Sequence, residues 1–250
     1  MFPINHELRT FMSRRMPVWD GVGGLNLQSI GKHIAATQAH VADAAGAVHR
    51  DPASITIIAV SKRKPVADIE AAYAAGLSNF GENYLQEALP KIQALAHLDA
   101  TWHFIGAIQS NKTRAIAEHF HWVHTLDRTK IARRLNDACP DGKTLQVCLQ
   151  VNVDEDPAKA GLSPGETAKV LSQVAELPAL RVRGLMTILH IDADPLASYG
   201  RLRTLFDDLS TMAGPAWDSL SMGMSRDFEQ AIAAGATHVR IGTDIFGARD

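Results

Sequence analysis

The amino-acid sequence predicts an α/β protein, a single TIM-type (β/α)8 barrel of eight parallel strands. Short apolar runs rich in Val, Ile, Phe and Trp alternate with helical stretches through most of the 250-residue chain. Strict alternation of this kind requires parallel strands joined by right-handed crossovers. No Gly-x-Gly-x-x-Gly fingerprint follows the first strand. An open doubly wound sheet, which often carries that fingerprint, is therefore the second choice.

The expected elements begin with a helix over residues 25–48, where apolar residues recur at helical spacing. Pro65 and Pro164 stand at first turns, where the fixed φ of proline suits a helix start. Gly76 and Gly235 follow last turns, where φ > 0 is tolerated. We expect strands at residues 55–60, 77–81, 102–106, 122–126, 145–153, 182–188, 219–223 and 238–242, and helices between them at 65–75, 83–96, 111–120, 128–138, 164–177, 198–212 and 226–235.

The composition is that of a soluble protein large enough for a full core, with 46% hydrophobic and 21% charged residues. The formal net charge of −2 gives no field that would favour nucleic acid or an anionic membrane surface as a partner. Cys139 and Cys148 are too few for a disulfide framework or a thiolate zinc site, so we expect a cytoplasmic protein. No apolar run approaches the roughly 18 to 20 residues that span a bilayer.

The amino-terminal segment differs in character from the rest of the chain. Residues 1–24 lack the continuous apolar stretch of a secretory signal, and no repeat or low-complexity linker indicates a second domain. We therefore expect a disordered tail over residues 1–24, with Met16 as another candidate start, and one barrel domain over residues 25–250.

The loops after the seventh and eighth expected strands carry the residues of a phosphate site. Functional sites of barrels lie at the carboxyl ends of the strands, and these two loops often bind phosphate. Gly223 and Gly242 let the backbone approach an anion, and hydroxyl groups come from Ser221, Ser225 and Thr243. Ser225 is also expected at the N-cap of the next helix. A turn and a cap explain either loop alone, but the two loops together favour phosphate binding.

Lys62 continues the alternation of the first strand, after Ile58 and Val60, and is expected at the mouth of the barrel. Lys64 stands directly before Pro65 and leaves that alternation. An amine held against an apolar wall near other cations has a lowered pKa and attacks carbonyl groups, as a Schiff-base lysine does. Two solvated lysines are the better explanation of this stretch when it is read alone. Together with a phosphate site it favours an aldehyde that carries a phosphate, and pyridoxal 5'-phosphate is such a molecule.

Arg240 lies within the eighth expected strand, on the same face as Gly242. An arginine inside a parallel strand must be paired or must face a polar cavity, because a guanidinium stays charged when it is buried. We predict that Arg240 faces the ligand; the alternative is a buried structural ion pair.

Five segments of the sequence resemble the YggS/PROSC family of pyridoxal phosphate homeostasis proteins, whose fold is related to the barrel domain of alanine racemase. They are "AVSKRKP", "FGENYLQEALPK", "WHFIGAIQSNKTR", "LSMGMSRDFEQAI" and "VRIGTDIFGARD". The resemblance runs from about residue 27 to the end of the chain, and five motifs in matching order make it specific. It implies a barrel like the N-terminal domain of alanine racemase.

The resemblance also implies roles for individual residues in binding pyridoxal 5'-phosphate. Lys62 matches the lysine that forms the Schiff base, Asn83 a residue beside the cofactor ring, and Arg240 the arginine that faces the pyridine nitrogen. The phosphate-binding motifs contain Ser221, Met222, Ser225, Gly242 and Thr243. The family role implies a monomer that stores, buffers or delivers the cofactor inside the cell, with enzymes that depend on pyridoxal phosphate as its partners.

An enzyme on this cofactor is the competing class. A racemase needs acid-base groups on both faces of the substrate carbon, and alanine racemase takes a tyrosine from a second domain of its partner subunit. This chain ends at Asp250, and Tyr84, beside Asn83, is expected to pack against the protein. We therefore predict a cofactor carrier without efficient turnover. The alternatives are a weak amino-acid racemase and a Schiff-base aldolase acting on sugar phosphates.

Other polar residues are expected to have structural roles. His119, His121 and His124 are expected at the amino-terminal end of the barrel, opposite the site, as core or surface histidines. The acidic residues at 154–156 are expected to form a solvated turn, because no third metal ligand is identifiable. Lys159 in the same loop is a candidate for added positive potential near the site.

Overall fold

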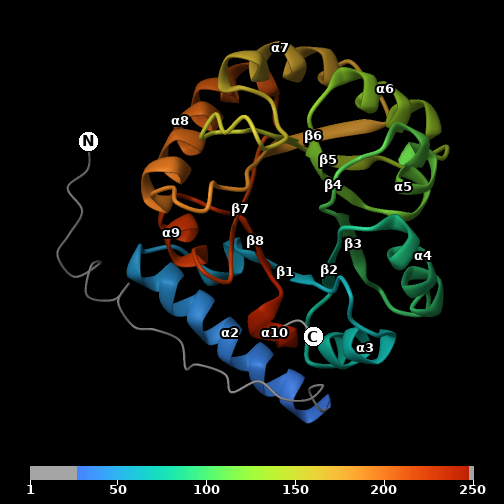
Figure 1. Cartoon of the computed structure of the whole chain (residues 1–250), viewed down its shortest axis with the longest axis vertical. Coiled ribbons are helices and arrows are strands. Elements are labelled where there is room, and N and C mark those ends of the chain that lie inside the picture. The colour runs from blue at the N-terminus through green and yellow to red at the C-terminus, as the bar shows by residue number, and fades with distance from the viewer. Residues whose placement is uncertain (1–26, 248–250) are drawn as a thin grey trace.

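The computed structural model describes residues 27–247, which form a closed barrel of parallel strands surrounded by helices (Figure 1). The eight strands follow chain order around the barrel, and β8 pairs with β1 to close it. This arrangement confirms the predicted (β/α)8 barrel. The strands are β1 (Thr56–Val60), β2 (Asn79–Glu82), β3 (Thr101–Phe104), β4 (Trp122–Leu126), β5 (Leu145–Gln150), β6 (Leu180–Met186), β7 (Ser219–Met224) and β8 (His238–Ile241).

Helices follow the strands and form the outer ring of Figure 1, with α2 before the first strand and packed against α10. Two short 3-10 turns, η1 (Pro52–Ser54) and η2 (Ser110–Lys112), precede β1 and α5. The α-helices are α2 (Leu27–Ala47), α3 (Val66–Ala74), α4 (Leu85–Ala94), α5 (Thr113–His119), α6 (Thr129–Ala138), α7 (Pro164–Ala175), α8 (Pro195–Ala213), α9 (Phe228–Ala233) and α10 (Thr243–Phe246).

Local chemistry explains several of these bounds. Ser163 and Glu166 form a reciprocal capping box at the start of α7, with Pro164 as the first helical residue. The Asp194 carboxylate accepts hydrogen bonds from the backbone N–H groups of Leu196 and Ala197, so α8 begins at Pro195, earlier than predicted.

The main hydrophobic core lies between the strands and the helices. Buried side chains such as Phe80, Phe120, Leu149 and Leu202 belong to one continuous cluster. The interior of the barrel is filled separately, and small residues make room there. A Cβ on Gly81 would lie 2.9 Å from Ile58 Cγ2, so the close packing at this level of the barrel requires glycine.

The expected tail over residues 1–24 lies outside the described residues. Within residues 27–247 no helix is long and apolar enough to cross a membrane. The pairing of β1 with β8 runs from Thr56 opposite His238 to Ala59 opposite Ile241. The carboxyl ends of the first and last strands therefore lie side by side, which the predicted site requires.

Candidate functional site

The β1 loop is held in place from the helix side by α4. Lys91 Nζ donates hydrogen bonds to the Ser61 carbonyl oxygen at 2.9 Å, to Glu82 Oε1 at 2.9 Å and to Glu87 Oε1 at 2.7 Å. The Ser61 hydroxyl donates to Glu82 Oε1 at 2.7 Å. Since successive side chains of a strand point to opposite faces, Ser61 directed at the helices places Lys62 on the barrel side.

Burial changes the pKa of the carboxyl group that Lys91 and Ser61 contact. Glu82 is fully buried, and burial raises the pKa of its carboxyl, while hydrogen bonds from Lys91 and Ser61 act in the opposite direction. Glu87 also accepts a hydrogen bond from the backbone N–H of Arg63, whose φ of 61° places it in the left-handed region. The loop from Ser61 to Lys64 is therefore fixed at several points.

The two lysines of this loop have different surroundings. Lys64 Nζ donates a hydrogen bond to the Phe246 carbonyl oxygen at 2.8 Å, which ties it to α10. Lys62 is half-buried at the carboxyl end of β1. The structure thus places Lys62 where the alternation predicted, and gives Lys64 a structural role that the sequence did not indicate.

Arg240 is buried inside the barrel, with 4% of its surface exposed. Its Nη1 donates to Ser221 Oγ at 2.9 Å and its Nη2 to the Thr187 carbonyl oxygen at 2.9 Å. None of the ion pairs between described residues includes Arg240, so the structural ion pair considered as an alternative is not present there. Burial lowers the pKa of the guanidinium, which nevertheless stays charged.

The β7 end differs from the prediction in detail. Asp227, not Ser225, is the N-cap residue of α9, and its carboxylate accepts from the Met224 backbone N–H at 2.6 Å. The N-cap prediction for Ser225 was wrong because the loop continues two residues further. The Ser225 hydroxyl instead lies near the Asp244 carboxyl, whose pKa is raised by burial and lowered by this hydroxyl, so the loops after β7 and β8 approach each other here. Gly223 adopts a φ of 92°, which favours glycine.

The other predicted phosphate residues divide into buried and accessible groups. Ser221 is fully buried and bonded to Arg240, and Met222 belongs to the hydrophobic core, so only the backbone of Met222 remains for a ligand. Thr243 is exposed, and Gly242 immediately precedes α10. A Cβ on Gly242 would lie 3.4 Å from the Val60 carbonyl oxygen, so the backbone after β8 lies close to β1 at this point.

Asn83 follows β2 on the same side of the barrel as Lys62. Its Oδ1 atom is buried and accepts no hydrogen bond within the described part of the chain. A Cβ on Gly106 would lie 1.9 Å from the Asn83 carbonyl oxygen, so the backbone after β3 packs directly against this residue. A buried acceptor without a donor is costly, and a donor on a bound ligand would satisfy it.

Some residues outside the predicted cofactor-binding site lie elsewhere than the sequence indicated. Tyr84 is 53% exposed, so it does not pack against the protein as expected. His119 and His121 lie near the amino-terminal end of β4, as predicted, but His124 is buried within the barrel and bonds Ser221. No group of three or more His, Cys, Asp or Glu residues that could hold a metal ion occurs among residues 27–247.

The acidic loop after β5 is more ordered than the solvated turn that was expected. Asp154 accepts hydrogen bonds from the Ser198 hydroxyl at 2.5 Å, from the His190 backbone N–H at 2.9 Å and from Arg201 Nη2 at 2.8 Å. Lys159 donates to the carbonyl oxygens of residues 188 and 189. Both side chains therefore join this loop to the segment that follows β6.

Comparisons with known proteins agree with this geometry. The family of the alanine racemase N-terminal domain matches residues 33–250. A "Pyridoxal phosphate homeostasis protein" of Pseudomonas aeruginosa is 52% identical over 228 residues, which cover 90% of this chain and 97% of that protein. A protein of Escherichia coli K12 with the same name is 45% identical over 231 residues, covering 90% and 98%.

The solved structures include PipY of Synechococcus elongatus with pyridoxal phosphate bound. It is 38% identical, covers 87% of this chain and 100% of its own, and superposes with a TM-score of 0.77. Alanine racemase from Corynebacterium glutamicum, at 17% identity and a TM-score of 0.66, shares the fold. The family predicted from the five motifs is confirmed: the chain belongs to the pyridoxal phosphate homeostasis proteins, which are built on the alanine racemase N-terminal domain.

Proposed function

We propose that this chain binds pyridoxal 5'-phosphate through a Schiff base on Lys62 and serves intracellular homeostasis of that cofactor. The observation that carries the proposal is the pairing of β1 with β8, because it sets the Lys62 loop beside Arg240 and the loop at Gly242. A family member of known structure, PipY, holds the same cofactor. The proposed role is storage, buffering or delivery, with enzymes that depend on the cofactor as recipients.

The residues present fit the chemical groups of this cofactor. Lys62 would supply the amine that condenses with the aldehyde, forming a C=N bond and releasing water. The hydroxyls of Ser225 and Thr243 and the backbone at Gly242 would receive the phosphate. Arg240 would face the pyridine nitrogen, and the vacant acceptor on Asn83 would take a donor beside the ring.

The same site argues against efficient turnover. When bound to an enzyme, this cofactor stabilises a substrate carbanion best if its pyridine nitrogen is protonated. A buried guanidinium opposite that nitrogen disfavours the proton by like-charge repulsion. The curated relatives are named for cofactor homeostasis rather than for a reaction. We accordingly propose a cytoplasmic, monomeric carrier.

Absorption spectroscopy of the purified protein with added cofactor tests the proposal. The wild-type protein should show a visible imine band, whereas Lys62→Ala should fold normally and lose that band while retaining weaker, non-covalent binding through the phosphate contacts. Lys64→Met and Lys159→Met serve as controls and should keep the band. A colourless wild-type protein, as a sugar-phosphate aldolase would be, or a full band in Lys62→Ala would contradict the proposal.

A further inference from the structure

A continuous row of hydrogen bonds crosses the interior of the barrel behind Arg240. Arg240 bonds Ser221 Oγ at 2.9 Å, and Ser221 Oγ lies 2.8 Å from His124 Nδ1. His124 Nε2 lies 2.9 Å from His103 Nδ1, and His103 Nε2 lies 3.0 Å from Asn79 Oδ1. The side chains come from β8, β7, β4, β3 and β2, and the predicted site contained only the two at the Arg240 end.

We propose that this row is a one-way hydrogen-bond chain in which every proton points away from Arg240, and that it replaces a carboxylate as the stabilising partner of the buried guanidinium. Ser221, His124, His103 and Asn79 are then positioning residues that act on the site through Arg240. The direction of the chain is a property of the protein alone. Its consequence for the cofactor rests on the function proposed above.

The direction follows from the chemistry of the first link. A guanidinium has only donors, so Ser221 Oγ must accept from Arg240. The hydroxyl retains one proton, and His124 Nδ1 is the one acceptor that Ser221 Oγ contacts within the described residues. If His124 Nδ1 carried a proton instead, that buried hydroxyl proton would have no partner there, at a cost of about 1–3 kcal/mol. His124 Nδ1 is therefore unprotonated.

The next two links follow in the same way. A neutral imidazole has one N–H, so His124 with a bare Nδ1 carries its proton on Nε2 and donates it to His103 Nδ1. His103 must then carry its own proton on Nε2, where it meets Asn79 Oδ1, an oxygen that can only accept. The orientation of the Asn79 amide agrees, because its Nδ2 donates to Ser78 Oγ at 3.3 Å.

The surroundings keep both rings neutral. Burial, with the nearby His238, Arg240 and His121, holds the pKa of His103 and the pKa of His124 well below the usual range. A protonated ring would put a donor against a donor and break the chain. Two neutral rings with aligned N–H groups instead turn the negative ends of their dipoles toward Arg240.

A second arginine on a barrel strand, the half-buried Arg183, shows what the chain replaces. Arg183, on β6, pairs with the Asp218 carboxylate at 2.5 Å, whereas none of the ion pairs in the described part of the chain includes Arg240. A carboxylate at Arg240 would cancel the positive potential at the position proposed for the pyridine nitrogen. The neutral, polarised chain accepts from Nη1 and the Thr187 carbonyl oxygen accepts from Nη2, and neither cancels the charge. The Asp227 carboxylate acts on the guanidinium only from beyond ion-pair distance.

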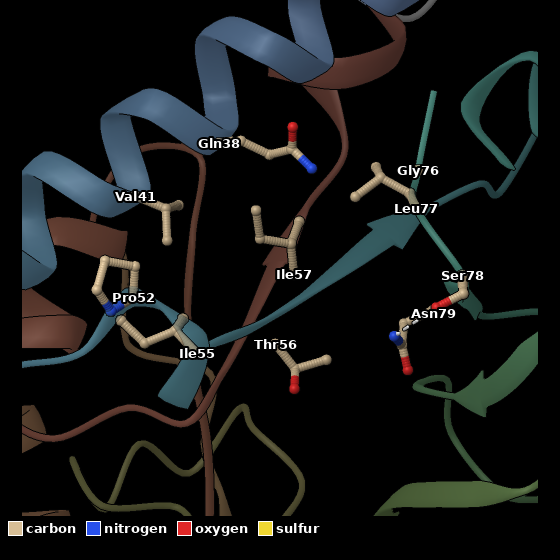
Figure 2. A pocket seen from close by; sticks show the side chains of 10 residues that line it. All are labelled: Gln38, Val41, Pro52, Ile55, Thr56, Ile57, Gly76, Leu77, Ser78 and Asn79. Carbon is tan, nitrogen blue, oxygen red and sulfur yellow. Dashed lines mark hydrogen bonds between the residues drawn. The ribbon is translucent and has the colours of Figure 1, made fainter. Parts of the chain in front are cut away.

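The far end of the chain reaches a cavity at the opposite end of the barrel from Lys62. Asn79 and Ser78 line this cavity of about 400 Å³, together with Thr56 on β1 and Gln38 on α2 (Figure 2). Figure 2 shows the Asn79 amide and the Ser78 hydroxyl joined by a hydrogen bond at its edge. The last group of the chain can therefore be altered without touching the cofactor loops.

The test is the protonation state of each histidine nitrogen in cofactor-free protein, read from long-range ¹H–¹⁵N correlation spectra of histidine-labelled samples. The wild-type protein should show His103 and His124 as neutral rings with the proton on Nε2. Their signals are assigned from His103→Gln and His124→Gln. A ring with its proton on Nδ1, or a charged ring at neutral pH, would overturn the proposal, whether or not the protein binds pyridoxal phosphate.

Variants of the two ends test what sets the direction. Ser221→Ala cuts the link to Arg240, but Asn79 Oδ1 still accepts from His103, so His103 and His124 should both keep the Nε2–H tautomer. Asn79→Leu removes only the last acceptor, and the Ser221 hydroxyl should keep the same tautomers. The double variant Ser221→Ala/Asn79→Leu removes both ends, so His124 should become a mixture of both tautomers. Thr125→Val is the matched control, since it removes the buried hydrogen bond from the Thr125 hydroxyl to the Gly106 carbonyl, on the same strand as His124, and should change neither ring. Unchanged Nε2–H tautomers in the double variant would overturn the proposal that Ser221 and Asn79 set the direction.

Discussion

At the scale of single residues, the charge of Arg240 is the feature that we propose distinguishes a carrier from an enzyme. The guanidinium is buried and is bonded to a hydroxyl and a carbonyl oxygen rather than to a carboxylate. Its full positive charge therefore acts on whatever lies next to it in a medium of low dielectric. A ring nitrogen placed there is kept unprotonated, which weakens the ring as an electron sink.

Arg240→Glu should reverse this effect. A carboxylate at the same position favours a protonated pyridine nitrogen, so the absorption band of the bound cofactor should shift and any trace racemisation of alanine should rise. The measurements are absorption spectra and a racemisation assay on the reconstituted variant. Arg181→Glu makes the same charge change on the exposed surface and should alter neither. An unchanged spectrum in Arg240→Glu would return Arg240 to a structural role.

Sequence reasoning at this scale succeeded where strand alternation alone was decisive. It separated Lys62 from Lys64, and it put Arg240 inside the barrel. It missed the bonds of His103 and His124, because contacts between side chains of different strands depend on the stagger of the closed barrel. The one indication in the sequence was that strand alternation places both histidines on the inner face of the barrel. A histidine that only fills the core would show the same alternation.

At the scale of elements, α4 controls the position of the β1 loop. Lys91 is 6% exposed and joins the buried Glu82 to the backbone of Ser61. An ion pair at this depth is stabilising only while both partners are present, because either charge alone would lack compensation for its desolvation. The helix and the loop that carries Lys62 are therefore coupled through one ammonium group.

Lys91→Met should lower the free energy of unfolding by about 3–5 kcal/mol, since Glu82 then has no charged partner. Urea unfolding at neutral pH measures the loss. The double variant Lys91→Met/Glu82→Gln should recover part of it, because no uncompensated charge remains in the interior. If the double variant were no more stable than Lys91→Met, the loss would come from packing rather than from the charge of Glu82.

The elements themselves could largely be predicted from periodicity. The presence of each strand and helix follows from the alternation of apolar runs and helical stretches, with proline and glycine at the helix ends. These patterns are local in the sequence. α10 was missed because Thr243–Phe246 is too short to show a helical period. β5 ends at Gln150, before the predicted residue 153. The Val151 N–H still donates to the Met186 carbonyl oxygen of β6, but Val151 itself pairs with Leu162 in an isolated bridge. That bridge depends on tertiary contacts.

At the scale of the whole molecule, the barrel interior couples stability to pH. Burial and neighbouring cations lower the pKa of His103, His124 and His238, the last to about 4. The unfolded chain therefore binds more protons than the folded chain between those pKa values and the ordinary histidine pKa of 6.5. Stability must fall as the pH drops through this window.

His124→Gln isolates one of these contributions. Lowering the pH from 7 to 5 should cost the wild-type protein about 2 kcal/mol for each buried neutral histidine, so the variant should lose that much less over the same range. Urea unfolding at several pH values gives the slope of the unfolding free energy against pH, which counts the protons taken up on unfolding. This number should be smaller by about one in the variant. His97→Gln, at an exposed position, is the control. An identical slope in His124→Gln and the wild-type protein would contradict a neutral, buried His124.

The closed barrel also explains how a single site is assembled from both ends of the chain. Lys62 follows the first strand and Arg240 lies in the last, yet β1 and β8 are neighbours. The sequence could predict this because chain order and right-handed crossovers determine which strands meet when eight parallel strands close.

The covalent attachment to Lys62 is the central claim, and borohydride reduction of the reconstituted protein followed by peptide mapping tests it most directly. Reduction converts an imine to a stable amine, so the phosphopyridoxyl group should be found on the peptide that contains Lys62. Two other lysines are internal competitors that donate to backbone carbonyls: Lys64 in the same loop and Lys159 in the loop after β5. A label on either of them, or none on Lys62, would contradict the account.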